Sequence, residues 1–212
     1  MAIDDITRSS LRQTGRILVS FLPLFVFLAI AWGHSLLRLR IGLYAGAALL
    51  LVMALGRLSR GAMMWAMAAF FTVAIVFGLW LENVWVVRHM GVLPGAALLT
   101  AAMVSMVLGR PFVQDYARAD VPAEQQETAG FVRSCYVLSS FWASVFLLMV
   151  VNAVAAFSSG LGRLFHLAVQ LALLAVATAY TAAYTARARR RRAAAGFTGG
   201  EGAAPRRQEH GA

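Results

Sequence analysis

The chain has 212 residues, of which 60% are hydrophobic and 13% are charged, and its formal net charge is +10. Soluble domains average about 25% charged residues, so this chain has too few polar groups to cover a globular surface, and its exterior must contact lipid. All the basic residues are arginines, which lie mostly between apolar stretches and gather only near the C-terminus; this distribution argues against a nucleic-acid partner. A single cysteine, Cys135, excludes an internal disulfide and a cysteine-based metal cluster.

Six apolar stretches qualify as lipid-crossing helices, which need about 20 residues each. The sequence predicts spans at residues 16–36, 39–57, 62–84, 91–109, 134–158 and 164–186. These runs are much longer than the strands of a membrane barrel, and backbone groups in lipid must bond within their own segment. The expected fold is therefore an all-α polytopic bundle over residues 1–186. An Arg-rich juxtamembrane segment and a disordered cytoplasmic tail should follow over residues 187–212.

The arginines predict how the bundle is oriented. Fifteen fall on the side that carries both termini, and four (Arg38, Arg40, Arg88 and Arg163) fall on the other side. The positive-inside rule then places both termini in the cytoplasm. An alternative stays open for the first span, because Ala29-Ile30-Ala31 is similar to a signal-peptidase site. Cleavage there leaves five spans.

Small residues at helical spacing predict which helix faces pack together, since helices in lipid associate by close approach. Span 2 contains Gly42-x-x-x-Gly46, and span 4 begins with Gly91-x-x-x-Gly95. Span 6 has an alanine stripe made of Ala168, Ala172, Ala175, Ala179 and Ala183.

The loop at residues 110–133 is the longest internal connection and is expected in the cytoplasm. Phe112, Val113 and Tyr116 share one side of a short helix, with Gln114, Asp115 and Arg118 directed toward water, as in an interfacial helix on the inner leaflet. A second short helix is expected from Pro122 to Gly130. After the last span, five arginines are predicted to bind anionic head groups at about 1 kcal/mol each: Arg187, Arg189, Arg190, Arg191 and Arg192.

Polar groups inside the predicted spans are few. Glu82 lies near the outer end of span 3, where an acid can reach the interface beside Trp80 and Trp85. His34, His89 and His166 fall on the same side, but their spacing does not favour a metal site or a haem pair. Motifs for nucleophile elbows, phosphate loops and zinc proteases are absent from the sequence. We therefore expect no catalytic residue, no metal and no cofactor, and a protein that is not an enzyme.

Several segments, taken in order, carry a resemblance to a known family. They are Phe21-Leu22-Pro23-Leu24 in span 1, Leu43-Tyr44-Ala45-Gly46 in span 2, Arg110-Pro111-Phe112-Val113-Gln114 after span 4, Val121-Pro122 in the loop, and Phe141-Trp142-Ala143 with Asn152 in span 5. In this series the chain resembles the intracellular septation protein A family of bacterial inner-membrane proteins. It departs from the family pattern at Ser139, where the family usually has Asn, and in its longer acidic loop and Arg-rich tail.

The resemblance implies a non-enzymatic role in cell-envelope synthesis or septation, through contacts with membrane protein partners and lipid. It carries over no catalytic residue. The positions it marks also have plain structural explanations: Pro23 as a kink, Pro111 as a helix stop, Pro122 as a helix start, Trp142 as an interface anchor and Asn152 as an interhelical bond.

Two alternatives remain open at this stage. One is a small transporter or channel subunit that uses Glu82 and Asn152 as polar path residues. The other is a metal- or redox-cofactor-binding membrane subunit that uses the histidines at the outer ends of the spans.

Overall fold

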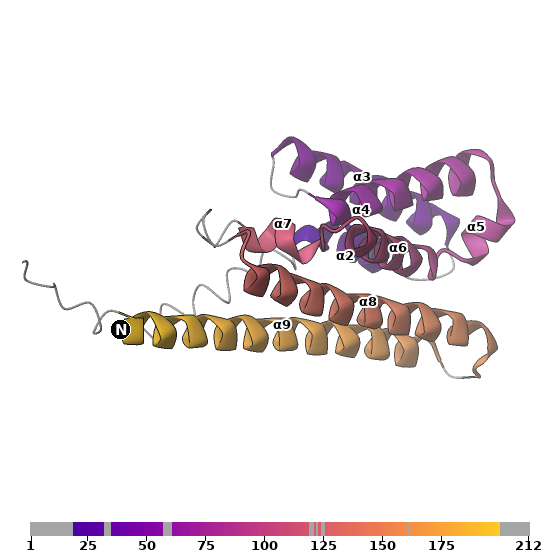
Figure 1. Cartoon of the computed structure of the whole chain (residues 1–212). Coiled ribbons are helices and arrows are strands. Elements are labelled where there is room, and N and C mark those ends of the chain that lie inside the picture. Colours follow the sequence, from indigo (N-terminus) through magenta and orange to yellow (C-terminus); the bar gives the residue numbers. More distant parts are fainter. Residues whose placement is uncertain are drawn as a thin grey trace, which may run out of the picture.

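A computed structural model describes residues 19–31, 35–56, 61–118, 121, 123, 126–160 and 162–199, with the backbone alone at Arg163, Arg189 and 191–199. Within these residues every regular element is a helix (Figure 1), which confirms the all-α fold. The elements in chain order are α2 (Leu22–Ile30), α3 (Leu36–Leu55), α4 (Ala62–Val73), the π-helix η1 (Ala74–Trp80), α5 (Val84–Arg88), α6 (Leu93–Val107), α7 (Val113–Ala117), α8 (Ala129–Ser158) and α9 (Arg163–Gly199).

Four helical segments are long and apolar enough to cross a membrane: Leu36–Leu55, Ala62–Trp80, Ala129–Ser158 and Leu164–Ala188. Helix α6 is apolar but has 15 residues, and α2 has nine, which corresponds to about 14 Å of helix. A bilayer core is about 30 Å thick. Six spans therefore remain a prediction, whereas four are supported by length and composition.

The last two helices differ from their predicted ranges. Helix α8 begins at Ala129, five residues before the predicted span, and so takes in the end of the 110–133 loop. Helix α9 passes through the arginine run and ends at Gly199. From the sequence, the chain was expected to be disordered after Ala193. Alanine and arginine are among the best helix formers, and extending an existing helix needs no new nucleus.

The helices alternate in direction between two ends of the bundle (Figure 1). We call the end that holds α7, the start of α8 and the start of α4 the α7 end. The opposite end, which holds α5, the end of α8 and the start of α9, is the α5 end. Helix α8 packs against α6, α7 and α9, while α2 packs on α3 and α4 packs on α6.

An aromatic cluster on α8 forms the centre of the core. Trp142 and Phe146 are fully buried. Phe21, just before α2, stacks on Trp142 with ring centroids 5.9 Å apart, and Phe112, just before α7, lies 6.5 Å from Phe146. The indole nitrogen of Trp142 donates a hydrogen bond of 3.0 Å to the hydroxyl of Thr181 on α9. This part of α8 thus contacts three other segments: the residues before α2, the residues before α7, and α9.

Two of the predicted glycine contacts are confirmed in span 2. A Cβ on Gly46 would lie 2.6 Å from the Phe71 ring and 2.9 Å from the carbonyl oxygen of Pro23, and one on Gly42 would lie 3.1 Å from the backbone of α2. In span 4, Gly95 lies close to Val150, but a Cβ on Gly91 would meet nothing within 4 Å. Glycine therefore permits the close approach of α2 to α3, and one of the two span 4 glycines serves the same purpose.

The alanine stripe of span 6 does not mark a buried face. All five of its alanines are exposed, while Ala177 and Thr181 are buried on another side of α9. The larger side chains of Leu173, Leu174 and Tyr184 pack with them against the core. The prediction from small residues was wrong here because bulky side chains provide the contact area with α8 instead.

A π-helical segment ends the third span. In η1 the N–H of Leu81 bonds to the carbonyl of Val76, five residues back, at 2.9 Å. Glu82 follows with a positive φ of 47°, and the side chain of Asn83 then accepts hydrogen bonds from the N–H groups of Trp85 and Val86 to cap α5. Glu82 is therefore an exposed turn residue beyond the span.

We predict that the Trp142–Thr181 bond couples α8 to α9 measurably. Trp142→Phe and Thr181→Val should each lower the unfolding free energy, and the double variant should lose less than the sum by about 0.6 kcal/mol, the mean for interhelical bonds in membrane proteins. Denaturant titration in detergent micelles measures the cycle. Trp65→Phe, at a site that is 69% exposed, is the control and should change little; strict additivity would contradict the coupling.

Candidate functional site

The segment after α6 is buried in the bundle. Pro111, Phe112, Val113 and Gln114 are all buried, so Gln114, which was predicted to face water, does not. Serine hydroxyls from two helices accept hydrogen bonds from the backbone of this segment. Ser105 accepts from the Phe112 N–H at 3.2 Å, and Ser139 accepts from the Val113 N–H at 3.4 Å. Backbone N–H groups that are buried in the protein need such partners because water does not reach them. The interfacial helix is thus packed into the bundle at the α7 end.

Asp115 joins α7 to the start of α4. Its carboxylate accepts a hydrogen bond from the Ala62 N–H, and a Cβ on Gly61, whose φ is +92°, would collide with that carboxylate. The carboxylate therefore caps α4 from a neighbouring helix, in place of a local N-cap side chain. Burial raises the pKa of Asp115 above its usual value, against the opposing effects of the Ala62 bond and the charges of Arg118 and Arg110.

Burial also raises the pKa of the neighbouring Tyr116, and the charge of Asp115 adds to this shift, although a hydrogen bond with Ser20 opposes it. The tyrosine therefore stays protonated at neutral pH. Its contact with Ser20 fixes α7 against the residues that precede α2.

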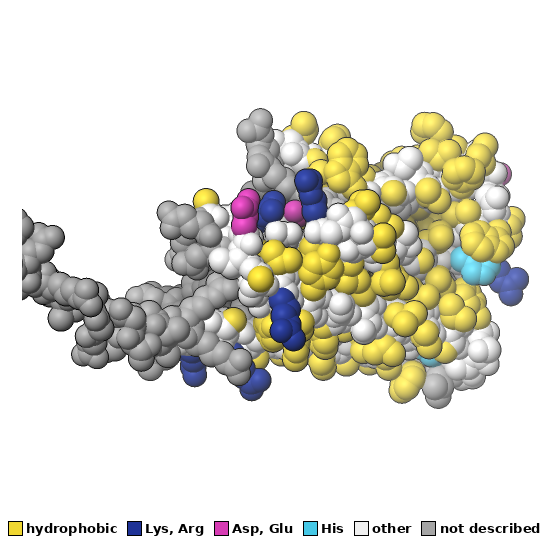
Figure 2. All heavy atoms as spheres, viewed as in Figure 1, with side chains coloured by type: hydrophobic (Ala, Val, Ile, Leu, Met, Phe, Trp, Pro, Cys, Tyr) yellow, Lys and Arg dark blue, Asp and Glu magenta, His cyan; other side chains and the backbone are white. Residues whose placement is uncertain are grey.

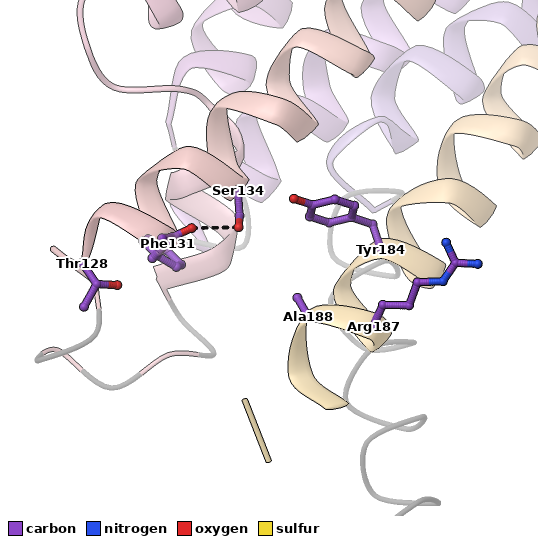
Figure 3. A pocket seen from close by; sticks show the side chains of 7 residues that line it. Thr128, Phe131, Ser134, Tyr184, Arg187 and Ala188 are labelled. Atoms are coloured by element: carbon purple, nitrogen blue, oxygen red, sulfur yellow. Dashed lines mark hydrogen bonds between the residues drawn. The ribbon is translucent and has the colours of Figure 1, made fainter. Parts of the chain in front are cut away.

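An open cleft lies between the start of α8 and the far part of α9 at the same end (Figure 3). It has a volume of about 380 Å³. Tyr184 points from α9 toward α8, the hydroxyl of Ser134 donates to the Gly130 carbonyl at 2.8 Å, and the exposed Arg187 also lines the cleft. The cleft thus combines an aromatic wall, hydroxyl groups and one guanidinium, which suits an anionic group attached to an apolar body.

The charged side chains are distributed unevenly over the surface. Figure 2 shows Arg, Asp and Glu gathered mainly at the α7 end of the visible face, with a broad hydrophobic surface over the middle of the bundle. Large apolar side chains nearer the middle of their helices, such as Tyr44, Leu148 and Val176, are 49%, 52% and 61% exposed. A band of this kind between polar ends fits contact with lipid.

At the α5 end, three polar side chains from α8, α9 and the turn between them form a chain of hydrogen bonds. Asn152 contacts the buried His166 twice: its Oδ1 lies 2.9 Å from Nδ1, and its Nδ2 donates to the His166 carbonyl at 3.0 Å. The other ring nitrogen, Nε2, lies 2.7 Å from the hydroxyl oxygen of Ser159. The interhelical bond expected of Asn152 is therefore confirmed.

The second histidine that the structure describes, His89, follows the last residue of α5. The His89 ring stacks on Trp85 with centroids 4.3 Å apart and lies 5.4 Å from the Phe157 ring of α8, while its Nδ1 bonds to the Trp85 carbonyl. No group of three or more His, Cys, Asp or Glu side chains is placed to hold a metal in the part of the chain that the structure describes, and His34 lies outside that part.

An apolar cavity of about 300 Å³ opens between α2, α6, α8 and α9. Its lining includes Phe25, Leu28, Gly91, Met149 and Leu171, with Gln170 as its only polar side chain among the described residues. The Gln170 amide donates to the Met149 carbonyl at 3.3 Å, and its Oε1 is buried without a hydrogen-bond partner in the described structure. Buried acceptors are normally satisfied, so a donor group belonging to a ligand or water fits beside it.

The remaining predicted positions divide between confirmed and corrected roles. Pro111 follows the end of α6, as a helix stop should. Pro23 lies in the first turn of α2 and makes no kink, and Trp142 is a core residue that does not reach the interface. Pro122, with most of the second loop helix, lies outside the described residues, as do the side chains of Arg189, Arg191 and Arg192. Glu82 and Asn152 do not share a polar path through the described bundle, because one is in an exposed turn and the other is bonded to His166.

Sequence reasoning missed Ser159 and the capping role of Asp115. Ser159 follows the last residue of α8 and stands next to Gly160, so a hydroxyl at a helix end was the available signal. For Asp115 the signal was Gly61 before an apolar helix that has no capping side chain of its own.

Comparisons of the chain with family models, curated proteins and solved structures gave no match.

We predict that the cap on α4 depends on an acceptor at position 115 but does not require its charge. Asp115→Ala should lower the unfolding free energy by about 0.5–2 kcal/mol, the usual cost of losing a cap. Asp115→Asn keeps an acceptor oxygen and should therefore keep the cap. Thermal unfolding in micelles compares the three proteins; an alanine variant as stable as wild type would contradict the cap.

The same pair tests the pKa shift of Asp115. Because its pKa is raised in the folded state, the folded protein binds the proton more readily, and this carboxyl stabilises the fold less as the pH rises through the window above its ordinary value of 3.8. The melting temperature of Asp115→Asn should therefore increase relative to wild type as pH rises through that window. A difference that is independent of pH would contradict the shift.

Proposed function

We propose that the chain is a bacterial inner-membrane protein whose α7 end faces the cytoplasm and binds anionic lipid head groups, and that it supports cell-envelope synthesis or septation through contacts with lipid and with membrane proteins. The observation that carries this proposal is the cleft lined by Tyr184 and Arg187, at the point where α9 leaves the apolar part of the bundle and continues into the arginine run. Guanidinium groups bind phosphate with paired hydrogen bonds.

The charges at the two ends support the same orientation. Arg110, Arg118, Arg133, Arg187 and Arg190 all belong to the α7 end and are exposed or partly exposed. At the opposite end the described arginine side chains are those of Arg38, Arg40 and Arg88. The full sequence widens this imbalance to fifteen against four, and an excess of arginine is typical of the cytoplasmic side.

The role in envelope synthesis rests on the resemblance to the septation protein A family. The packing of the bundle supports the idea that the protein acts as a scaffold. Its centre is filled by the Trp142 cluster, and the buried segment before α7 presents α7 and its charged neighbours at the α7 end. A firmly packed α7 with Arg118 exposed beside Asp115 suits a partner protein that recognises a fixed surface.

Lipid binding can be measured by native mass spectrometry of the purified protein with phosphatidylglycerol or phosphatidylcholine. We expect preference for the anionic lipid, and Arg187→Gln should weaken it about fivefold, the equivalent of about 1 kcal/mol for one arginine near a membrane surface. Arg88→Gln, at the other end, is the matched control. Equal losses in the two variants would contradict the cleft as the binding site.

The cellular role has its own test. A strain without the gene should form filaments or become sensitive to detergent, and wild-type protein should restore it whereas the Arg187→Gln variant restores it less well. Fusions of alkaline phosphatase after Gly160 and after Gly199 check the orientation, because the enzyme is active only outside the cytoplasm. An active fusion at Gly199 would reverse the proposed topology, and a normal deletion strain would contradict the envelope role.

A further inference from the structure

The hydrogen bonds at the α5 end determine which atom carries each proton. Asn152 Nδ2 donates to the His166 carbonyl, and a carbonyl can only accept, so the orientation of the amide is settled. Its Oδ1 then faces His166 Nδ1, and this ring nitrogen must carry the hydrogen. The neutral imidazole is left with a lone pair on Nε2, 2.7 Å from Ser159 Oγ, so the serine hydroxyl donates to it.

This is the arrangement of a nucleophile, a general base and a residue that orients the base. An imidazole that accepts a hydrogen bond from a serine through Nε2, while a side-chain oxygen holds its Nδ1–H, is the geometry by which serine is activated on unrelated folds. We propose that Ser159 and His166 form a catalytic site, positioned by Asn152, that cleaves ester bonds of membrane lipids at the α5 end of the bundle. The proposal goes beyond lipid-head-group binding at the α7 end.

The surroundings of Ser159 leave room for a substrate. His166 is only 8% exposed, so its ring is held in place, whereas Ser159 is partly exposed. A Cβ built on Gly160 or Gly162, on either side of the turn, would meet nothing within 4 Å. A fixed base beside a nucleophile that can be approached is what acyl transfer requires.

The apolar cavity explains the choice of a lipid ester. Gln170 lies four residues after His166, hence one turn deeper on the same face of α9, and it lines the cavity with Leu167, Leu171 and Leu174. An acyl chain seated in the cavity would place its carbonyl toward the α5 end, where Ser159 lies. The Oε1 of Gln170 is an acceptor without a partner in the described structure, and because an acyl ester has no donor group, a water beside the chain would satisfy it.

The reaction balances with an ester and water. Ser159 Oγ attacks the carbonyl carbon as its proton passes to His166 Nε2, and the proton then leaves with the alcohol when the ester C–O bond breaks. Water next attacks the acyl-serine, giving its proton to Nε2, and the fatty acid is released as Oγ regains that proton. Asn152 holds the ring and its Nδ1–H in position throughout and exchanges no proton.

The first experiment is covalent labelling of the full-length protein in lipid nanodiscs with a fluorophosphonate, a reagent that modifies activated serines. We expect a single adduct on Ser159 by peptide mass spectrometry, absent in Ser159→Ala and unchanged in the matched control Ser158→Ala. Ser158 is exposed, and its hydroxyl bonds to the Ala155 carbonyl. A wild-type protein that remains unlabelled, or equal labelling of the two variants, overturns the proposal.

Two further variants separate catalysis from a purely structural bond. His166→Gln should slow labelling at least 100-fold, in line with the usual contribution of a general base. Asn152→Leu, which removes both of the bonds that hold His166, should also slow labelling in protein that remains folded. Melting temperatures identify variants that have unfolded. A folded variant that has a lower melting temperature but labels at the wild-type rate would show that the network only joins α8 to α9. That result would overturn the proposal.

The acyl cavity is tested with nitrophenyl esters of short and long fatty acids. Gly91→Leu puts a side chain into the cavity lining at a position where nothing lies within 4 Å of the new Cβ. We expect it to lower the ratio of kcat/KM for the long-chain ester to that for the acetyl ester at least tenfold. Equal effects on both esters, or none, would show that the cavity does not hold the acyl chain.

Discussion

The packing of Trp142 and Phe146 on α8 is the interaction on which the rest of the bundle depends. Both rings are fully buried, and they join segments far apart in sequence: Phe21 before α2, Phe112 before α7 and Thr181 on α9. Because lipid removes most of the hydrophobic gain from bringing helices together, such contacts must come from shape and from individual polar bonds. A tryptophan whose ring packs against Phe21 and Phe146 and whose N–H reaches the hydroxyl of Thr181 supplies both.

The lipid around the bundle also explains why polar side chains lie mainly at the helix ends. Where a helix stops, its terminal N–H and carbonyl groups need partners, and side chains supply them at several points of the described bundle. Ser105 and Ser139 receive the backbone before α7, Asp115 caps α4, and Asn83 caps α5. Ser159 and His166 likewise lie near helix ends, whereas the middle of the bundle is filled mainly by aromatic and aliphatic groups.

Hydropathy and periodicity predicted the helical class and most of the span positions, because long apolar runs have few other solutions in lipid. They could not predict that Gln114 and the backbone before α7 would be buried, since the amphipathic pattern of α7 fits an interfacial helix equally well until Ser105 and Ser139 are known to lie beside it. The alanine stripe of α9 misled for a related reason: small residues permit close packing, but the side chains on the neighbouring helix decide whether it occurs. Ser159, Asn152 and His166 belong to two helices and a turn, and no local motif joins them.

The use of an amide beside His166, where many activated serines have a carboxylate, follows from the membrane setting. A buried carboxylate near the apolar cavity would be costly in a medium of low dielectric, whereas Asn152 is neutral. An amide in this position carries a risk, because it can turn its NH₂ toward the imidazole and impose the wrong tautomer. Here the His166 carbonyl occupies that NH₂ group at 3.0 Å, so the oxygen must face Nδ1. The backbone of the base thus selects the tautomer that leaves Nε2 free to accept the proton of Ser159.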